Sequence, residues 1–156
     1  MKIFRLIIVI MLIAPAMSSC EKDDDTDQTA PTIDLSAEDA FPQQCDTLYR
    51  GETFTFIATF TDNEGLGSYS LDVHNNFDHH SHTTEVEECD PWPVQTPVNP
   101  YLLIEGYDIS DAPQTFTTQL EITIPDDVDQ GDYHFMIRVV DINGWQAMKG
   151  LSVKIL

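Results

Sequence analysis

The chain has 156 residues, of which 27 are Asp or Glu and 7 are Lys or Arg, so its formal net charge is −20. That excess of negative charge makes nucleic acid an unfavourable partner, because binding to phosphates needs Lys and Arg that displace counterions. Hydrophobic residues make up 42% of the chain, which supports one packed domain and excludes a wholly disordered acidic protein.

Residues 1–19 have the pattern of an export signal. Lys2 and Arg5 precede an apolar run over residues 6–14, which is shorter than the roughly 20 residues that a membrane-spanning helix needs. The segment leads into Met-Ser-Ser-Cys, which resembles the lipobox of bacterial lipoproteins and implies that Cys20 is lipidated. An ordinary secretory signal with a chance cysteine is the alternative. Removing residues 1–19 takes away two positive charges and no negative one, so the net charge changes from −20 to −22.

Residues 20–30 are expected to form the lipidated cysteine and a flexible acidic tether. The stretch has no apolar periodicity and is rich in Asp and Thr. Its beginning, Cys-Glu-Lys-Asp-Asp-Asp, resembles the surface-export signal in lipoproteins of one Gram-negative phylum. The resemblance implies an outer-membrane lipoprotein that is held by its lipid and faces outward. A lipoprotein that faces the periplasm is the alternative.

Residues 31–156 are expected to form one domain of about seven short strands. Residues 53–61 alternate apolar side chains with Thr, which is the period of a strand with one buried face, and the later segments repeat this alternation. Asn143-Gly144 is a strong hairpin signal between the last two segments. The expected strands are residues 32–36, 53–61, 68–74, 101–104, 115–124, 133–141 and 145–155.

Residues 75–111 interrupt this regularity after the third strand. Pro91, Pro93, Pro97 and Pro100 lie too close together for a central strand or a helix interior. The whole pattern favours an all-β, immunoglobulin-like Greek-key β-sandwich with a Pro-rich insertion after the third strand. Residues 129–133 (Asp-Gln-Gly-Asp-Tyr) resemble the tyrosine corner at the start of the sixth strand of such sandwiches.

Cys45 and Cys89 are expected to form a disulfide. Once Cys20 carries the lipid, they remain as an even pair in an oxidising compartment. Two free buried thiols are the alternative. The pair does not fit the inter-sheet bridge of antibody domains, because Cys45 precedes the second expected strand and Cys89 follows the third.

The topology predicts that the histidines gather at one end of the sandwich. In an immunoglobulin-like fold the third and sixth strands are antiparallel neighbours, so His74 and His134 should lie side by side on the outward face. Three more histidines follow His74 in the next loop. Imidazole nitrogen suits zinc or copper, and Asp78 could bind the ion or orient a histidine N–H. The predicted metal-binding residues are His74, His79, His80, His82, His134 and Asp78.

Two other interpretations of the histidine loop remain open: a solvated polar loop in which the histidines are incidental, and a pH-sensitive loop. At the opposite end of the sandwich, the turn with Asp62, Asn63 and Glu64 and the turn with Asp141 and Asn143 offer oxygen ligands for Ca²⁺. Calcium is the weaker prediction, because Asp and Asn are also ordinary turn residues.

Catalysis is not expected from this sequence. Ser81 lies between two histidines, but a flexible loop supplies neither an orienting third group nor an oxyanion hole. Glu85, Glu87 and Glu88 could act as bases near a metal ion, but they form no specific motif.

The chain resembles a family of uncharacterised lipoproteins from the same Gram-negative phylum, a domain of unknown function with an immunoglobulin-like fold. The resemblance is carried by Gly65-Leu66, by residues 73–82 (Val-His-Asn-Asn-Phe-Asp-His-His-Ser-His) and by residues 131–141. It covers most of the exported chain and supports the fold. The family brings no established activity, so the metal hypothesis depends on the residues themselves.

Taken together, these features predict a surface-exposed outer-membrane lipoprotein that binds Zn²⁺ or Cu²⁺ through its histidines and is not an enzyme. Its histidine end should point away from the membrane, toward an outer-membrane receptor or an extracellular ligand. The alternative is an adhesion, scaffold or glycan-binding module in which the histidine loop is incidental; Trp92 and Trp145 are the candidate sugar platforms.

Overall fold

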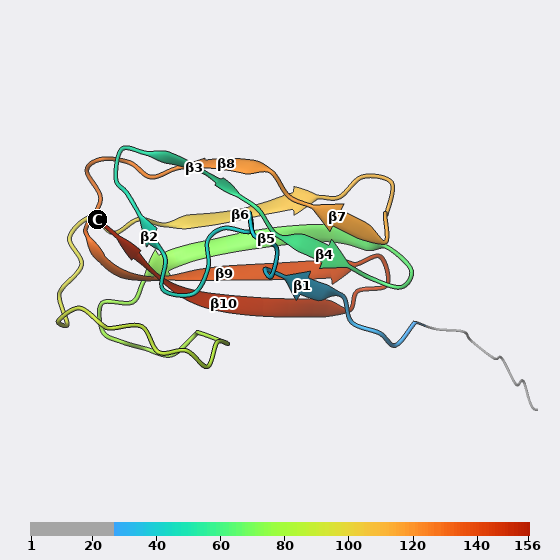
Figure 1. Ribbon diagram of the computed structural model, residues 1–156, viewed down its shortest axis with the longest axis horizontal. Helices are drawn as coiled ribbons and strands as arrows, with labels where there is room; N and C mark the ends of the chain where they lie inside the picture. Colours follow the sequence, from blue (N-terminus) through green and yellow to red (C-terminus); the bar gives the residue numbers. More distant parts are fainter. Residues whose placement is uncertain (1–26) are drawn as a thin grey trace, which may run out of the picture.

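The computed structural model describes residues 27–156, which form an all-β sandwich (Figure 1). The expected signal segment, Cys20 and most of the tether lie outside the described residues. Within the described part, no helix is long and apolar enough to cross a membrane. The strands are β1 (Thr32–Asp34), β2 (Thr47–Leu48), β3 (Thr53–Phe56), β4 (Thr59–Thr61), β5 (Leu66–Asn75), β6 (Leu103–Asp108), β7 (Thr115–Thr117), β8 (Leu120–Thr123), β9 (Gly131–Asp141) and β10 (Gln146–Ile155).

The sandwich has two layers. One layer is a five-stranded sheet in the order β2-β10-β9-β5-β6, in which β2 runs parallel to β10 and the other pairs are antiparallel. The other layer contains β1-β4-β7 and the pair β3-β8. The loop of residues 75–100 extends from one end of the long strands (Figure 1). This order confirms the expected sandwich, because β5 lies beside β9 and β9 lies beside β10.

Two expected strands are each divided in the structure. Residues 53–61 form β3 and β4, and residues 115–124 contain β7 and β8. The buried Thr118 hydroxyl donates to the Phe56 carbonyl (3.0 Å) and accepts from the Ala58 N–H (2.9 Å). A side chain thus replaces a backbone partner between the two strand pairs. Alternation of apolar residues continues through such a break and does not reveal it.

The two edge strands of the five-stranded sheet also differ from the expectation. Residues 101–104 were predicted as a short edge strand, whereas β6 begins at Leu103 and continues to Asp108, paired with β5. The two-residue strand β2 was not predicted, because it is too short to show a period. It pairs with the end of β10 and begins two residues after Cys45, so it helps to position that cysteine.

The core lies between the layers, and β9 shows how the sequence builds it. Tyr133, Phe135 and Ile137 alternate along β9, and all three are fully buried. From the other layer, the Phe56 ring packs against Phe135 with the ring centroids 5.5 Å apart. Burying each large apolar side chain contributes about 1.5–3 kcal/mol, which fixes the face that points inward. The intervening residues of β9, including His134, therefore lie on the outer face.

A tyrosine corner fixes the start of β9, as expected. The Tyr133 hydroxyl donates to the Asp129 carbonyl (2.7 Å) and accepts from the Tyr101 N–H (3.2 Å). Burial raises the pKa of the Tyr133 phenol. The corner thus holds the backbone immediately before His134 in one position, and this residue is the first component of the site described below.

Candidate metal centre

His74 and His134 lie directly opposite each other on β5 and β9, with their ring centroids 5.5 Å apart. Both are on the outer face of the sheet, because their neighbours Val73 and Tyr133 point inward and are fully buried. The expected pairing of the two strands is therefore observed. His134 is only 1% exposed, because the loop that follows β5 covers it.

This loop, residues 75–100, folds back over the outer face of the sheet. Near its start, Phe77 is buried with its ring perpendicular to that of Tyr133, at a centroid distance of 5.3 Å. At His79 the backbone adopts the left-handed conformation (φ 60°), which is uncommon outside glycine and marks a sharp change of chain direction. The next residues, His80 and His82, come to lie beside the two strand histidines.

The same loop is held against β10. The Thr84 N–H donates to the Gly150 carbonyl (2.9 Å), and the Gly150 N–H donates to the Thr84 hydroxyl (3.1 Å). A Cβ atom at position 150 would collide with the His82 carbonyl and the Met136 sulfur. A glycine is therefore required for the loop to approach the strand this closely.

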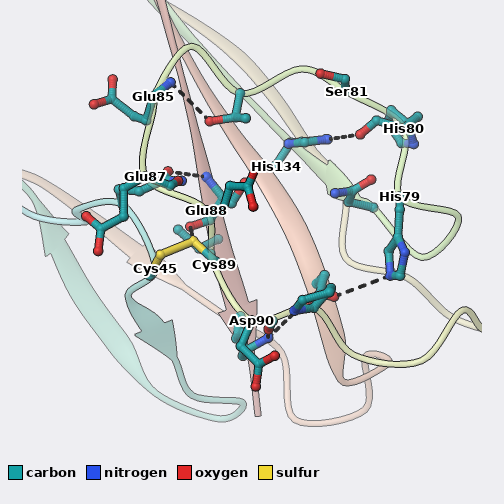
Figure 2. Close-up of a pocket in the computed structure, with 18 of the residues that line it drawn as sticks. Cys45, His79, His80, Ser81, Glu85, Glu87, Glu88, Cys89, Asp90 and His134 are labelled. Atoms are coloured by element: carbon teal, nitrogen blue, oxygen red, sulfur yellow. Dashed lines mark hydrogen bonds and ion pairs between the residues drawn. A yellow bond between two sulfur atoms is a disulfide. The ribbon is translucent and has the colours of Figure 1, made fainter.

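The expected disulfide between Cys45 and Cys89 is confirmed, with the two Cα atoms 5.3 Å apart (Figure 2). The Cys45 N–H donates to the Ser152 carbonyl on β10 (2.8 Å), so the bridge connects the loop to the sheet. The segment between His74 and Cys89 is thus fixed at both ends. A loop that is ordered in advance loses less conformational entropy when its side chains bind an ion.

Three histidines bring their ring nitrogens within 4.8 Å of one another: His74, His80 and His82. His74 Nε2 lies 3.2 Å from His82 Nδ1 and 3.5 Å from His80 Nε2. Zinc–nitrogen bonds of about 2.0–2.1 Å at tetrahedral angles place ligand nitrogens about 3.3–3.4 Å apart. The observed spacing therefore fits three ligands of a single tetrahedral ion.

Two carboxylates orient these rings. His74 Nδ1 lies 2.8 Å from Asp72 Oδ1, and His80 Nδ1 lies 2.5 Å from Asp78 Oδ1. Each carboxylate accepts the Nδ1 proton and leaves the Nε2 lone pair available, as in the carboxylate–histidine pairs of metal sites. The hydrogen bond from His80 lowers the pKa of Asp78. We call Asp72 and Asp78 the orienting carboxylates.

Sequence reasoning included Asp78 but missed Asp72. The signal was present, because Asp-x-His occurs at residues 72–74 and 78–80, although it also occurs at residues 132–134, where Asp132 pairs with Lys154 instead. In a strand, residues two positions apart lie on the same face, so an Asp at position 72 can reach the ring at position 74. The pattern becomes informative only when the outward direction of both side chains is known.

His134 completes a cluster of four rings. Its ring centroid lies 5.0 Å from that of His80 and 5.2 Å from that of His82. His134 Nε2 lies 2.9 Å from the His80 carbonyl and donates its proton there, which leaves Nδ1 as the unprotonated nitrogen. That Nδ1 is buried and has no hydrogen-bond partner within residues 27–156. Burial and the neighbouring imidazoles lower the pKa of His134, so the ring is neutral and its lone pair is available.

We call His74, His80, His82 and His134 the histidine cluster.

Residues 18–156 match the family described as a domain of unknown function, DUF4625. The chain belongs to the DUF4625 family. No curated protein matches it.

One solved structure supports the fold of this DUF4625 domain. A DUF4466 family protein from Parabacteroides merdae is similar with a TM-score of 0.51 and 16% identity, over 81% of this chain and 45% of that one. A mutant of the SrpA adhesin from Streptococcus sanguinis is similar with a TM-score of 0.44 and 19% identity, over 84% of this chain and 57% of that one. The chain thus spans about half the length of these proteins. At these identities the likeness to the first concerns the fold alone.

His79 lies apart from the histidine cluster in this DUF4625 domain. Its ring points away from His80 and His134 (Figure 2). His79 Nε2 lies 2.8 Å from the Trp92 carbonyl and 3.8 Å from Asp132 Oδ2. Five of the six residues predicted at the metal site are therefore grouped together, and His79 instead connects two parts of the loop.

Two open cavities flank the histidine cluster. One, of about 710 Å³, is lined by His80, His134, the disulfide and a group of acidic residues that includes Glu85, Glu87 and Glu88 (Figure 2). The other, of about 620 Å³, is lined by His74 and His82 together with Met136 and Met148. An ion can therefore approach from either side, and the acidic lining of the first cavity favours cations.

The residues predicted for calcium lie at the other end of the sandwich. The turn of Asp62, Asn63 and Glu64 meets the turn of Asp141 and Asn143, and the Asn143 amide donates to Glu64 (3.0 Å). The start of the described chain joins them: the Asn63 amide donates to Asp27 Oδ1 (3.0 Å). Sequence reasoning assigned Asp27 to a flexible tether and did not place it at this end.

Proposed function

We propose that this protein is a surface-exposed outer-membrane lipoprotein whose sandwich domain binds one Zn²⁺ or Cu²⁺ ion through the histidine cluster. The observation that carries the proposal is the distance from His74 Nε2 to two other ring nitrogens, 3.2 Å to His82 Nδ1 and 3.5 Å to His80 Nε2, which fits a single tetrahedral ion. The orienting carboxylates add support, because each directs a histidine lone pair toward the shared centre.

In this proposal His74, His80 and His82 are the three ligands, because one nitrogen from each lies within 4.8 Å of the others. His134 stands outside this group of nitrogens, and its buried Nδ1 would become a fourth ligand only if its ring and the ion come closer together. Burying an imidazole nitrogen without a partner is unfavourable, and an ion beside it would provide that partner. The donor set is compatible with both metals, since neutral imidazole binds zinc and copper well.

Binding, rather than catalysis, is the proposed role. Ser81 makes no hydrogen bond to a histidine within residues 27–156, so the described part of the chain contains no nucleophile–base pair at this position. The rings instead face one another, at centroid distances between 4.8 and 5.6 Å. That arrangement suits capture of an ion and its transfer to a partner such as an outer-membrane receptor.

The position of the tether supports an outward orientation. The chain enters the sandwich at the end opposite the histidine loop (Figure 1). If Cys20 carries a lipid, only six residues separate it from Asp27, which is held against the turns at that end. The histidine cluster would then point away from the membrane, toward the medium or a partner.

A structural or adhesive module is the second candidate. One observation favours it: β6 is an edge strand that exposes large apolar side chains, with Ile104 69% and Leu102, just before the strand, 63% exposed. Such an edge can accept another strand through backbone hydrogen bonds. In that case the histidines would be incidental, and metal ions would not stabilise the fold.

Metal titration followed by thermal melting separates the two candidates. The full chain, expressed with its signal and purified in detergent without a polyhistidine tag, is titrated with Zn²⁺ and with Cu²⁺. An ion at about 100 times its dissociation constant should add about 2.7 kcal/mol to the free energy of unfolding. The expected binding stoichiometry is one ion per chain.

His79 provides the matched control, because it lies in the same loop but outside the histidine cluster. His82→Ala, at an exposed position, should abolish the metal-dependent stabilisation, and so should His74→Ala and His134→Ala. His79→Ala should retain it. The proposal fails if His82→Ala and His79→Ala respond alike, or if neither ion binds the parent chain below millimolar concentrations.

A further inference from the structure

Three aspartates from distant parts of the chain converge at the tether end of the sandwich. Asp62 follows β4, Asp141 ends β9, and Asp27 precedes β1. Their carboxylate oxygens lie within 4.8 Å of one another. The three side chains are 9%, 4% and 7% exposed, respectively. We call them the aspartate cluster.

Two of these carboxylates use one oxygen to form a turn and leave the other without a partner. Asp62 Oδ1 accepts from the Glu64 N–H (2.9 Å) and the Gly65 N–H (2.8 Å). Asp141 Oδ1 accepts from the Asn143 N–H (2.8 Å) and the Trp145 N–H (2.9 Å). The Oδ2 atoms of both are buried and have no hydrogen-bond partner within residues 27–156.

Turn formation therefore uses only one of the two carboxylate oxygens of Asp62 and of Asp141. A neutral Asn at either position would form the same turn bonds through its carbonyl oxygen, without placing a second negative oxygen in the interior. Buried carboxylates are normally paired with a cation, because an unpaired buried charge is strongly unfavourable and like charges repel one another. Among residues 27–156, no Lys, Arg or His forms an ion pair with any of the three aspartates.

Hydrogen bonds hold Asp27 in its place in the cluster. The Asn63 amide and the Thr29 N–H lower the pKa of Asp27, so this carboxyl keeps its negative charge at neutral pH. The Trp145 indole N–H donates to the Asp27 carbonyl (2.8 Å), which holds the backbone of Asp27 in place.

We propose that the aspartate cluster binds Ca²⁺ through Asp27, Asp62 and Asp141, and that the ion fastens the N-terminal segment to the sandwich. The donors are all oxygens, which suits a hard cation and differs from the nitrogen donors of the histidine cluster. Ca²⁺ fits better than Mg²⁺, because Mg²⁺ keeps most of its waters whereas Ca²⁺ accepts several carboxylates at flexible angles. Glu64, whose carboxylate accepts from the Asn143 amide at the edge of the cluster (3.0 Å), would supply a further oxygen ligand.

Terbium luminescence provides a direct test, because Trp145 contacts both Asp27 and Asp141. Tb³⁺ replaces Ca²⁺ in oxygen sites and emits strongly when a nearby indole transfers energy to it. The full chain, purified in detergent and freed of metal with a chelator, is titrated with Tb³⁺ under tryptophan excitation. We expect sensitised emission that saturates at one ion per chain and is displaced by Ca²⁺, with an affinity in the range of extracellular calcium modules, about 10⁻⁴–10⁻³ M.

Asp62→Asn and Asp141→Asn are the decisive variants, because they keep the turn oxygens and remove the unpaired charge. Each should abolish the sensitised emission and the rise in melting temperature with Ca²⁺. Without Ca²⁺ each should melt at or above the temperature of the parent chain, because the repulsion is gone. Asp126→Asn, at an exposed carboxylate outside the cluster, is the matched control and should retain both responses.

Three results would overturn the proposal: an unchanged Ca²⁺ response in Asp62→Asn and Asp141→Asn, a lower melting temperature of these variants without Ca²⁺, or no Ca²⁺ response in the parent chain at millimolar concentrations. The outcome is independent of the zinc and copper experiment. His82→Ala should keep the full Ca²⁺ response, and Asp62→Asn should keep the full Zn²⁺ or Cu²⁺ response.

Discussion

His74 Nδ1 lies 2.8 Å from Asp72 Oδ1, two residues earlier on the same face of β5. Asp78 stands in the same relation to His80 in the loop. The two contacts are local in sequence, yet they direct rings from a strand and from a loop toward one centre. Removing either contact should therefore weaken metal binding without much change in the free energy of unfolding.

Neutralising the orienting carboxylates should weaken metal binding with little effect on stability. Asp72→Asn and Asp78→Asn should each lower the Zn²⁺ or Cu²⁺ affinity about 10- to 100-fold. The Asp72 side chain is 46% exposed and that of Asp78 is 74% exposed, so the free energy of unfolding without metal should change by less than about 0.5 kcal/mol. Isothermal titration and urea unfolding measure the two quantities. Asp90→Asn, in the lining of the adjacent cavity, is the control and should leave the affinity unchanged.

Gly150→Ala should displace the histidine loop without removing a ligand. The new methyl group would meet the His82 carbonyl and the Met136 sulfur, so the loop must move away from β10. We expect a loss of about 1–3 kcal/mol in the free energy of unfolding and at least about a tenfold loss of metal affinity. Gly106→Ala on β6 is the matched control, because a Cβ there meets no atom within 4 Å. Equal behaviour of the two variants would contradict the close contact between loop and strand.

Removing the disulfide should affect both folding and the site. Cys45 and Cys89 are 44 residues apart, and in the chain-entropy model closing a loop of that size stabilises the fold by about 4 kcal/mol. The double variant Cys45→Ser/Cys89→Ser should lose up to that amount and bind Zn²⁺ or Cu²⁺ more weakly, because the loop is released at one end. The parent chain treated with a reducing agent should behave in the same way. Metal affinity that is unaffected by reduction would show that the bridge does not position the loop.

The buried tyrosines should make the fold sensitive to alkaline pH. Burial raises the pKa of Tyr69 above its ordinary value of 10.0. The folded state therefore holds this proton more tightly than the unfolded state does. The resulting stability is complete below about pH 10 and is lost as the pH rises through the folded pKa. Each such tyrosine adds a slope of about 1.4 kcal/mol per pH unit within that window.

Urea unfolding across the alkaline range measures this slope. Tyr69→Phe removes the ionisable group and should make the slope shallower, whereas Tyr49→Phe, at a residue that is 51% exposed, is the control and should not. Unchanged pH dependence in Tyr69→Phe would argue against burial of its phenol.

The sequence predicts the sandwich and the centre of the site because both depend on alternation and strand order. Apolar residues at every second position of β9 place His134 outward, and the antiparallel pairing with β5 places His74 beside it. The tyrosine corner follows from a short motif, and the disulfide follows from the even pair of cysteines that remains once Cys20 is assigned to the lipid. Covering of His134 by the loop could not be predicted in this way, because it depends on contacts between distant residues.

Which of the loop histidines lie against the sheet also depends on tertiary contacts. His79, His80 and His82 are equivalent in the sequence pattern, but the left-handed backbone at His79 and the contact at Gly150 decide which rings reach the sheet. Asp27 was missed for a similar reason. A polar stretch without periodicity predicts a tether, whereas the structure places its last acidic residue against two turns.

Strand β9 connects the two ends of the molecule. His134 lies near its beginning and Asp141 at its end, so seven residues at about 3.3 Å each separate the two positions by about 23 Å. Because both neighbouring strands hold β9 along its length, this separation is a fixed spacer. For a chain attached to a membrane through the Asp141 end, the length of a single strand thus sets how high the imidazoles stand above the lipid surface.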